Sequence, residues 1–514
     1  MRSSRIKLPP LAGLLLTLCA SYTIASAAAM AAEATAVLIV NARIVDGLGS
    51  PIRDGAVRIS GDSIIEVGEL TPLAKETVID AKGLVLAPGF IDTHSHHDEG
   101  LKHHLDGLPL LTQGITTTVF GQDGFHQLPL KTFLEGFEAE PSTVNIASYV
   151  GHNTLREAVM QENSNRVASA AEVSAMRKLL LEELTAGAFG LSTGLEYEPG
   201  IYSTSGEVIT LAKATASHGG RYISHMRSED RFLWEAVDEI LEIGRQSQMP
   251  VQISHMKLAA KSLWGDADKL LRILDAARAD GIDVTADVYP YEYWQSTMWV
   301  LLPDRNADNR EEIRYVLDEL TPADGIIFTH FAANPDYVNK SVAEIAALRG
   351  VDEVTAFSDL LKESAAWEQA HPGETGESIM GRSMSEKDIE AFLQWPHTNI
   401  CSDGGFTGHP RGHGAFPRVL ARYVRDKPSL SLSDAVEAMT SRAAAHLGIT
   451  DRGRIVPGAK ADLVLFDPEL IQDNAGIRDG QVLSSGIVKV WVNGELTLAD
   501  GKATDARPGR VLRP

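Results

Sequence analysis

The chain has 514 residues, of which 44% are hydrophobic and 23% charged, a composition typical of soluble globular proteins and unlike disordered or fibrous chains. Its 47 Lys and Arg against 69 Asp and Glu give a net charge of −22, so the protein's field repels phosphate backbones and anionic lipid surfaces. Nucleic acid is therefore not an expected partner. The length suits two domains, because an α/β barrel can occupy about 250 residues as one unit.

The amino-terminal segment is typical of a secretory signal peptide. Arg2, Arg5 and Lys7 precede an apolar run over 11–20, and small residues then follow up to Ala31. The apolar run is shorter than the roughly 20 residues that a membrane span needs. We therefore expect residues 1–31 to be removed, no stable membrane anchor, and a mature protein that is secreted or periplasmic. One of the two cysteines would remain, which excludes an internal disulfide.

Both ends of the remaining chain are rich in short β-strand patterns. Runs within 37–67 are separated by Asp-Gly and Gly-Asp turns, and similar runs return at 463–466 and 488–492. The last run is followed by Asn493-Gly494, a strong hairpin signal. We predict that residues 34–87 and 453–514 build one small β-sandwich domain from both chain ends.

Between these ends, apolar runs alternate with helical patterns. The helical pattern over 172–185, for example, follows a capping box formed by Ser169 and Glu172. Continuous apolar runs suit parallel strands buried on both faces, and this sequence has them at 84–91, 115–120, 144–150, 188–192, 221–224, 251–254, 282–286, 326–329 and 398–401.

This alternation predicts an α/β fold with a (β/α)₈ TIM-like barrel over 88–448. There is one run more than such a barrel needs. The run at 326–329 lies in a long stretch from about 303 to 396, which we interpret as an insertion.

Histidines occur where several predicted strands end. His94 and His96 follow the first barrel strand, and alternation along a strand places them on one face. His225 and His255 end two later strands, at the edge where barrels place their active sites. Four imidazoles suit zinc, which keeps an open position in catalytic sites. Asp403 follows the last strand, where a turn or helix-capping role is the alternative.

Longer motifs surround these residues: GFIDTHSHHD, QGITTTVFG, GHNTLR, GAFGLSTGLEYEPG, ISHMRSE, QISHMK, DVYPY, CSDG and HPRGHGAFPR. Together they resemble the amidohydrolase superfamily and, within it, the N-acyl-D-amino-acid deacylases. The resemblance runs from about residue 36 to 500.

The resemblance implies a metal-dependent deacylase in which His94, His96, His225 and His255 are metal ligands and Asp403 is the general base. A bound divalent metal lowers the pKa of water and polarises the amide carbonyl, and a nearby carboxylate can pass the proton to the leaving amine.

The resemblance also implies that Lys257, Tyr289 and Arg411 hold the carboxylate of the substrate. An arginine fork matches a carboxylate, and Lys257 would share the strand face of His255 two residues before it. The alternative is that Lys257 and Arg411 are surface charges and that Tyr289 is a packed aromatic side chain. His152 could line the pocket, although a solvated loop would explain it equally well.

One position departs from the family pattern. A cysteine that ligates or bridges the metals usually follows the second strand, and this sequence has Asp123 there. Because a carboxylate is a harder ligand than a thiolate, Mn or Co could replace zinc. Glu196 is an alternative bridge, and residues 188–194 contain no lysine that could serve as a carboxylated bridge. Whether one or two metal ions bind stays open.

The leading interpretation is an exported zinc hydrolase of small molecules, namely N-acyl-D-amino acids or dipeptides with a C-terminal D-residue. One alternative is another amidohydrolase activity, such as a cyclic amidase or an isoaspartyl-type dipeptidase. A second alternative is a periplasmic binding protein that kept the fold and lost turnover. The sequence does not specify the acyl chain, the side chain or the stereochemistry of the substrate. It also does not specify the oligomeric state of the protein.

Overall fold

The computed structural model describes residues 36–514, and the expected signal peptide lies outside this range. None of the helices within it combines the length and the apolar character that a membrane span requires.

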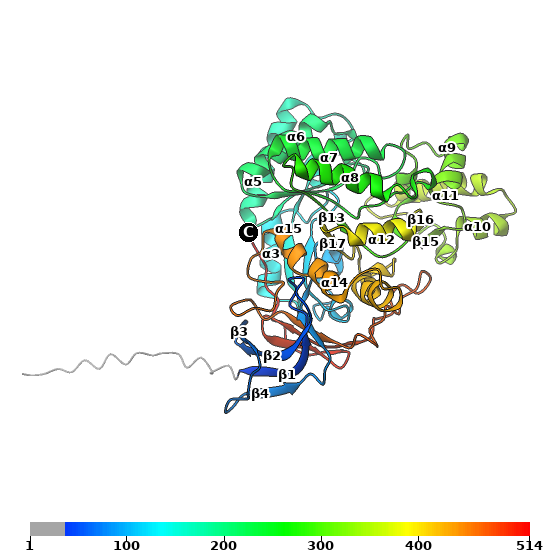
Figure 1. The fold of residues 1–514 in the computed structure, drawn as a ribbon. Helices are drawn as coiled ribbons and strands as arrows, with labels where there is room; N and C mark the ends of the chain where they lie inside the picture. The colour runs from blue at the N-terminus through cyan, green and yellow to red at the C-terminus, as the bar shows by residue number, and fades with distance from the viewer. Residues whose placement is uncertain (1–35) are drawn as a thin grey trace, which may run out of the picture. The chain divides into compact units, whose positions relative to one another are not determined.

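Strands from both chain ends form one nine-stranded sheet (Figure 1). β5 (Val85–Pro88) pairs antiparallel with β18 (Leu463–Phe466) and so joins the two ends. The predicted hairpin turn at Asn493 connects β19 and β20. The other strands are β1 (Val37–Ile44), β2 (Arg53–Ser60), β3 (Ser63–Gly68), β4 (Thr77–Asp80), β19 (Ile487–Val492), β20 (Glu495–Ala499) and β21 (Lys502–Ala503).

The two faces of this sheet pack against different cores. Leu86, Leu463 and Leu465 lie in an apolar cluster formed within the sheet domain. Their sequence neighbours Val85 and Val464 lie in the large core that the barrel shares. Because side chains alternate between the faces of a strand, these short apolar runs bury both faces and attach the sheet to the barrel.

The central part of the chain forms the predicted (β/α)₈ barrel. Its parallel strands are β6 (Phe90–Asp92), β7 (Ile115–Phe120), β8 (Asn145–Ser148) with its continuation β9 (Val150–Gly151), β10 (Gly190–Gly194), β11 (Arg221–His225), β12 (Val251–Ile253), β13 (Val284–Val288) and β17 (Thr398–Ile400).

The barrel closes between its first and last strands. The backbone N–H of Asp403, after β17, donates to the carbonyl of His94, after β6, at 2.9 Å. The N–H of His96 donates back to the carbonyl of Gly404, also at 2.9 Å. The predicted first strand over 84–91 is divided between two sheets, because the chain leaves the nine-stranded sheet at Pro88 and enters the barrel at Phe90.

Helices surround the barrel, and the predicted capping box of Ser169 and Glu172 begins α5. The helices outside the insertion are α1 (Asp98–Leu101), α2 (Leu108–Leu111), α3 (Leu130–Ala139), α4 (His152–Met160), α5 (Ala170–Ala186), α6 (Ser205–Ser217), α7 (Leu233–Ser247), α8 (Ala267–Ala279), α12 (Glu386–Gln394), α13 (Arg411–Arg418), α14 (Leu432–Met439) and α15 (Ser441–Leu447).

The insertion has its own small sheet and apolar core. It contains β14 (Tyr293–Ser296), β15 (Ile326–Phe331), β16 (Glu377–Arg382), α9 (Arg310–Tyr315), α10 (Val342–Arg349) and α11 (Glu353–Ala370). The extra predicted run at 326–329 is β15, outside the barrel. The insertion begins and ends earlier than the predicted 303–396, because β14 pairs with β16 whereas α12 packs against α8 and β17 of the barrel.

Candidate metal centre

The carboxyl ends of the barrel strands bring the predicted ligands together. His94 and His96 follow β6, Asp123 follows β7, and the remaining candidates, His225, His255 and Asp403, end or follow β11, β12 and β17. All of them except the fully buried His94 line a cavity of about 680 Å³. The structure therefore places this cluster where barrel enzymes carry their active sites.

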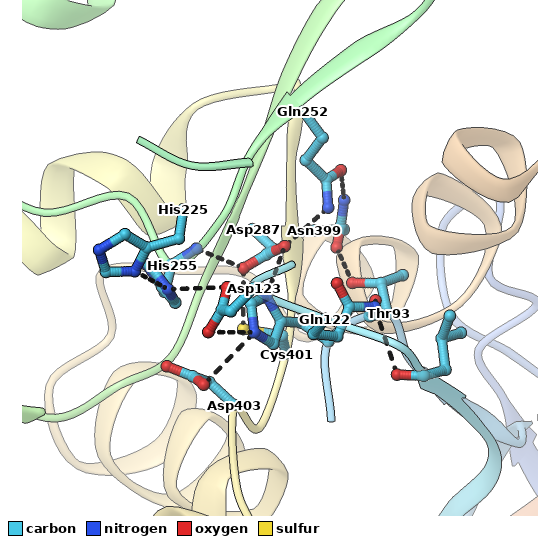
Figure 2. A network of polar contacts seen from close by, with 12 residues as sticks. Thr93, Gln122, Asp123, His225, Gln252, His255, Asp287, Asn399, Cys401 and Asp403 are labelled. Atoms are coloured by element: carbon cyan, nitrogen blue, oxygen red, sulfur yellow. Dashed lines mark hydrogen bonds and ion pairs between the residues drawn. The ribbon is translucent and has the colours of Figure 1, made fainter. Parts of the chain in front are cut away.

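Asp123 lies close to three histidines, and Figure 2 shows it beside His255. Its Oδ2 is 3.3 Å from His96 Nε2 and 3.5 Å from His94 Nε2, and its Oδ1 is 3.5 Å from His255 Nε2. Asp403 Oδ1 lies 3.2 Å and 3.4 Å from the same atoms of His96 and His94. Two ligands at about 2.1 Å from one tetrahedral zinc ion are about 3.4 Å apart, so these separations suit a shared metal ion.

Several buried atoms of the cluster have charged neighbours but no hydrogen bond of their own. Both ring nitrogens of His94 and Oδ1 of Asp123 are buried without a hydrogen bond among the described groups. Burial of unpartnered polar atoms is costly. A divalent cation would remove this cost, and it would also offset the repulsion between the neighbouring carboxylates of Asp123 and Asp403. The donor set therefore fits a metal ion.

His225 completes a second group of donors. Its Nδ1 is 3.1 Å from His255 Nε2, and its Nε2 is 2.9 Å from a carboxylate oxygen of Glu196. Burial lowers the pKa of His225 to about 4, which favours the neutral imidazole that binds metal. A carboxylate on the outer nitrogen commonly fixes the tautomer of a ligating histidine. Glu196 thus contacts one histidine, whereas Asp123 lies among three.

We expect Asp123→Asn to weaken zinc binding by about 100-fold or more, because it removes a negative charge from the centre of the cluster. Glu196→Gln should weaken it by about 10-fold, near the lower end of the effect of outer hydrogen-bond partners. Equilibrium zinc titration measures both constants, with the exposed Glu182→Gln as a control. Unchanged affinity in Asp123→Asn, with a large loss in Glu196→Gln, would assign the bridge to Glu196.

The backbone of the centre is strained. Asp123, His255 and Asp403 have φ angles of 52°, 35° and 50°, in the left-handed region that residues other than glycine rarely adopt. Each such residue costs on the order of 1 kcal/mol or more and is kept where the surroundings enforce it, often at active sites. Gly194 allows one of these turns, since a Cβ there would lie 2.1 Å from the carbonyl oxygen of Asp123.

The three residues expected to bind the substrate carboxylate line the same cavity. Arg411 forms a 2.6 Å ion pair with Asp403, and its guanidinium carbon lies 4.5 Å from the centre of the Tyr289 ring. Lys257 donates to both oxygens of Glu229 at 2.7 Å. Glu229 was not among the predicted site residues, although it stands four residues after His225 within the ISHMRSE motif.

A buried network behind the cluster was also not predicted (Figure 2). Asp287, fully buried in β13, accepts from the backbone N–H of His255 at 2.6 Å, from the Cys401 thiol at 3.1 Å and from Gln252 at 2.7 Å. Its Oδ2 is 3.6 Å from His94 Nδ1. Asp287 therefore holds two of the candidate ligands from the side away from the cavity.

His152 lies away from the site. It begins α4, is fully buried, and contacts Glu207 of α6 at 2.8 Å. Arg156 donates to the same carboxylate at 2.6 Å. This ion cluster connects two helices and does not line the cavity, which corrects the pocket role considered for His152.

Comparisons with known proteins show the family to which the chain belongs. The amidohydrolase family model matches residues 77–306 and 339–498. The chain is 34% identical to D-aminoacylase and 35% identical to N-acyl-D-aspartate deacylase, both of Alcaligenes xylosoxydans xylosoxydans, over 92–93% of this chain and 95–97% of those proteins. The solved N-acyl-D-glutamate deacylase of Bordetella bronchiseptica, complexed with zinc and a phosphonate inhibitor, superposes with a TM-score of 0.81 at 32% identity, covering 93% of this chain and 99% of that one.

Proposed function

Because this chain belongs to the amidohydrolase family, we propose that it hydrolyses the amide bond of N-acyl-D-amino acids or of dipeptides with a C-terminal D-residue, with zinc as its metal. The observation that carries this proposal is the position of Lys257, Tyr289 and Arg411, which line one cavity with the metal cluster. The relatives that act on N-acyl-D-amino acids support the same reaction.

The residues of the chain have separate roles in this reaction. Zinc bound to the cluster would supply Lewis acidity to the amide carbonyl and to water. Burial acts to raise the pKa of Asp403, but Arg411 and the histidines outweigh it and hold that pKa well below its usual range. Asp403 is therefore ionised, which is the form that a general base needs in order to accept a proton from water and return it to the leaving nitrogen.

The two cations favour an open-chain substrate. Arg411 and Lys257 present complementary charge to a free carboxylate beside the scissile amide. The rings of hydantoin and dihydropyrimidine have no such carboxylate, so this pair favours acyl amino acids over cyclic amides of those two types.

We expect the zinc-loaded protein to release free amine from N-acetyl-D-amino acids in preference to their L enantiomers. Masking the carboxylate as an amide should lower kcat/KM by about 10-fold or more, because each charged hydrogen bond contributes about 1.5–3 kcal/mol. Amine release from matched D, L and amide-capped pairs, alongside hydantoins, measures this. Hydrolysis of the cyclic amides alone would reject the proposal, and absence of any turnover would favour the binding-protein alternative.

The proposal includes export, for which the amino-terminal sequence pattern is the support. Periplasmic fractionation with sequencing of the mature amino terminus tests it.

A further inference from the structure

The cavity extends from the metal centre along the insertion. Residues of the insertion line it. The polar ones and Trp294 come from two segments, around β14 and around the start of β16: Trp294, Gln295, Ser296, Thr297, Thr375, Glu377 and Ser378. Val300, Leu301, Leu320 and Thr321 line it from the chain between these segments. This wall therefore combines hydroxyl and amide groups with an apolar part, and it lies outside the barrel that carries the catalytic residues.

Glu377 is an unusual member of this wall. It is the first residue of β16 and is fully buried. Its Oε1 accepts from the backbone N–H of Met298 at 2.7 Å, whereas its Oε2 is buried without a partner among the described groups. Burial raises the pKa of Glu377 to about 8, so a neighbouring positive charge would stabilise its ionised form. An unpartnered carboxyl oxygen therefore stands in a wall of the cavity.

The charges around the cavity indicate what this oxygen would accept. Among the described lining residues, the lysine and arginine side chains are Lys257 and Arg411, and each is already paired with a carboxylate. The insertion wall contributes neither type. An ammonium or guanidinium group would supply a donor to the unpartnered oxygen and would stabilise the ionised form of Glu377, whereas a second substrate carboxylate would find no lysine or arginine in this wall.

We propose that the insertion wall is a subsite for the side chain of the substrate and that Glu377 receives a cationic side chain, as in N-acyl derivatives of D-lysine or D-arginine. This inference rests on the proposed function and narrows its substrate class. It also separates this protein from its relatives named for N-acyl-D-aspartate and N-acyl-D-glutamate.

The test compares zinc-loaded protein on N-acetyl-D-lysine, N-acetyl-D-norleucine and N-acetyl-D-glutamate. Norleucine has the four-carbon side chain of lysine and lacks its ε-ammonium group. We expect kcat/KM for the lysine derivative to exceed that for norleucine by about 10-fold or more, the contribution of one charged hydrogen bond, and the glutamate derivative to be slowest.

Glu377→Gln keeps the shape of the side chain and removes its charge, so the preference for lysine over norleucine should fall to within about 3-fold. Activity on norleucine should change little, and the exposed Glu374→Gln serves as the matched control. Zinc content and melting temperature identify a variant that fails to fold, and N-acetyl-D-arginine on the wild-type protein then supplies the second readout.

The experiments distinguish failure of the proposed subsite from failure of the proposed function. Turnover of norleucine or glutamate derivatives at least as fast as lysine overturns the subsite and leaves the proposed function intact. An unchanged preference in folded Glu377→Gln also overturns it. Absence of turnover across the series overturns the proposed function, and calorimetric binding of the lysine and norleucine derivatives then decides the subsite by the same ratio.

Discussion

Replacing Asp403 with asparagine is expected to lower kcat by about 10²-fold or more while the protein keeps its zinc. The amide preserves the shape of the side chain but cannot accept a proton from water. Zinc should remain because His94, His96, Asp123 and His255 still surround the site. Steady-state kinetics combined with metal analysis of the same preparation measures both quantities.

Asp324→Asn is a suitable control, since that carboxylate is exposed and pairs with Arg382 on the insertion. Its kinetics should match the wild type. Near-normal turnover in Asp403→Asn would assign the general base to another residue. Loss of zinc together with activity would instead make Asp403 primarily a ligand.

His255→Ala should remove most of the bound zinc and with it the activity. His255 Nε2 faces both His225, at 3.1 Å, and Asp123, at 3.5 Å, so its loss affects both groups of donors. Changes in outer-shell partners alone weaken metal binding by about 10- to 100-fold, and loss of a ligand should exceed that range. Zinc content after dialysis against a buffered chelator measures the effect.

The exposed His218→Ala, at the end of α6, controls for loss of an imidazole elsewhere. Excess zinc should partly restore activity to His255→Ala if the ligand role is correct, because mass action offsets weaker binding. A full zinc content in His255→Ala at limiting metal would contradict the assignment.

Site residues could be predicted from the sequence where a metal-ligating side chain stands at the end of a predicted strand. His225 and His255 end apolar runs, and the carboxyl ends of parallel strands meet at one edge of a barrel. Asp287 directly follows the predicted strand at 282–286, but its contacts with His94 and His255 depend on the tertiary fold. Glu229 lies in a loop and lacked the strand-end signal. Glu229 reaches Lys257 only because the loop after β11 lies beside the loop after β12, a tertiary contact that periodicity does not encode.

The same limit explains the differences in the fold. β14 has the sequence Tyr-Trp-Gln-Ser, too short and too polar to stand out as a strand, and its pairing with β16 defines it. His152 follows a glycine in a motif typical of a loop, but it begins a helix whose contact with Glu207 buries it. In both cases the local structure depends on a contact with a residue far away in the sequence, β16 for β14 and Glu207 for His152.

The pairing of β5 with β18 has a consequence for folding kinetics. The whole barrel lies between these two strands in the sequence, so their hydrogen bonds close a very long loop. Loop-closure entropy disfavours such contacts until the intervening chain is compact, and non-local pairing slows folding. We therefore expect β5 to pair with β18 only after the barrel between them is compact.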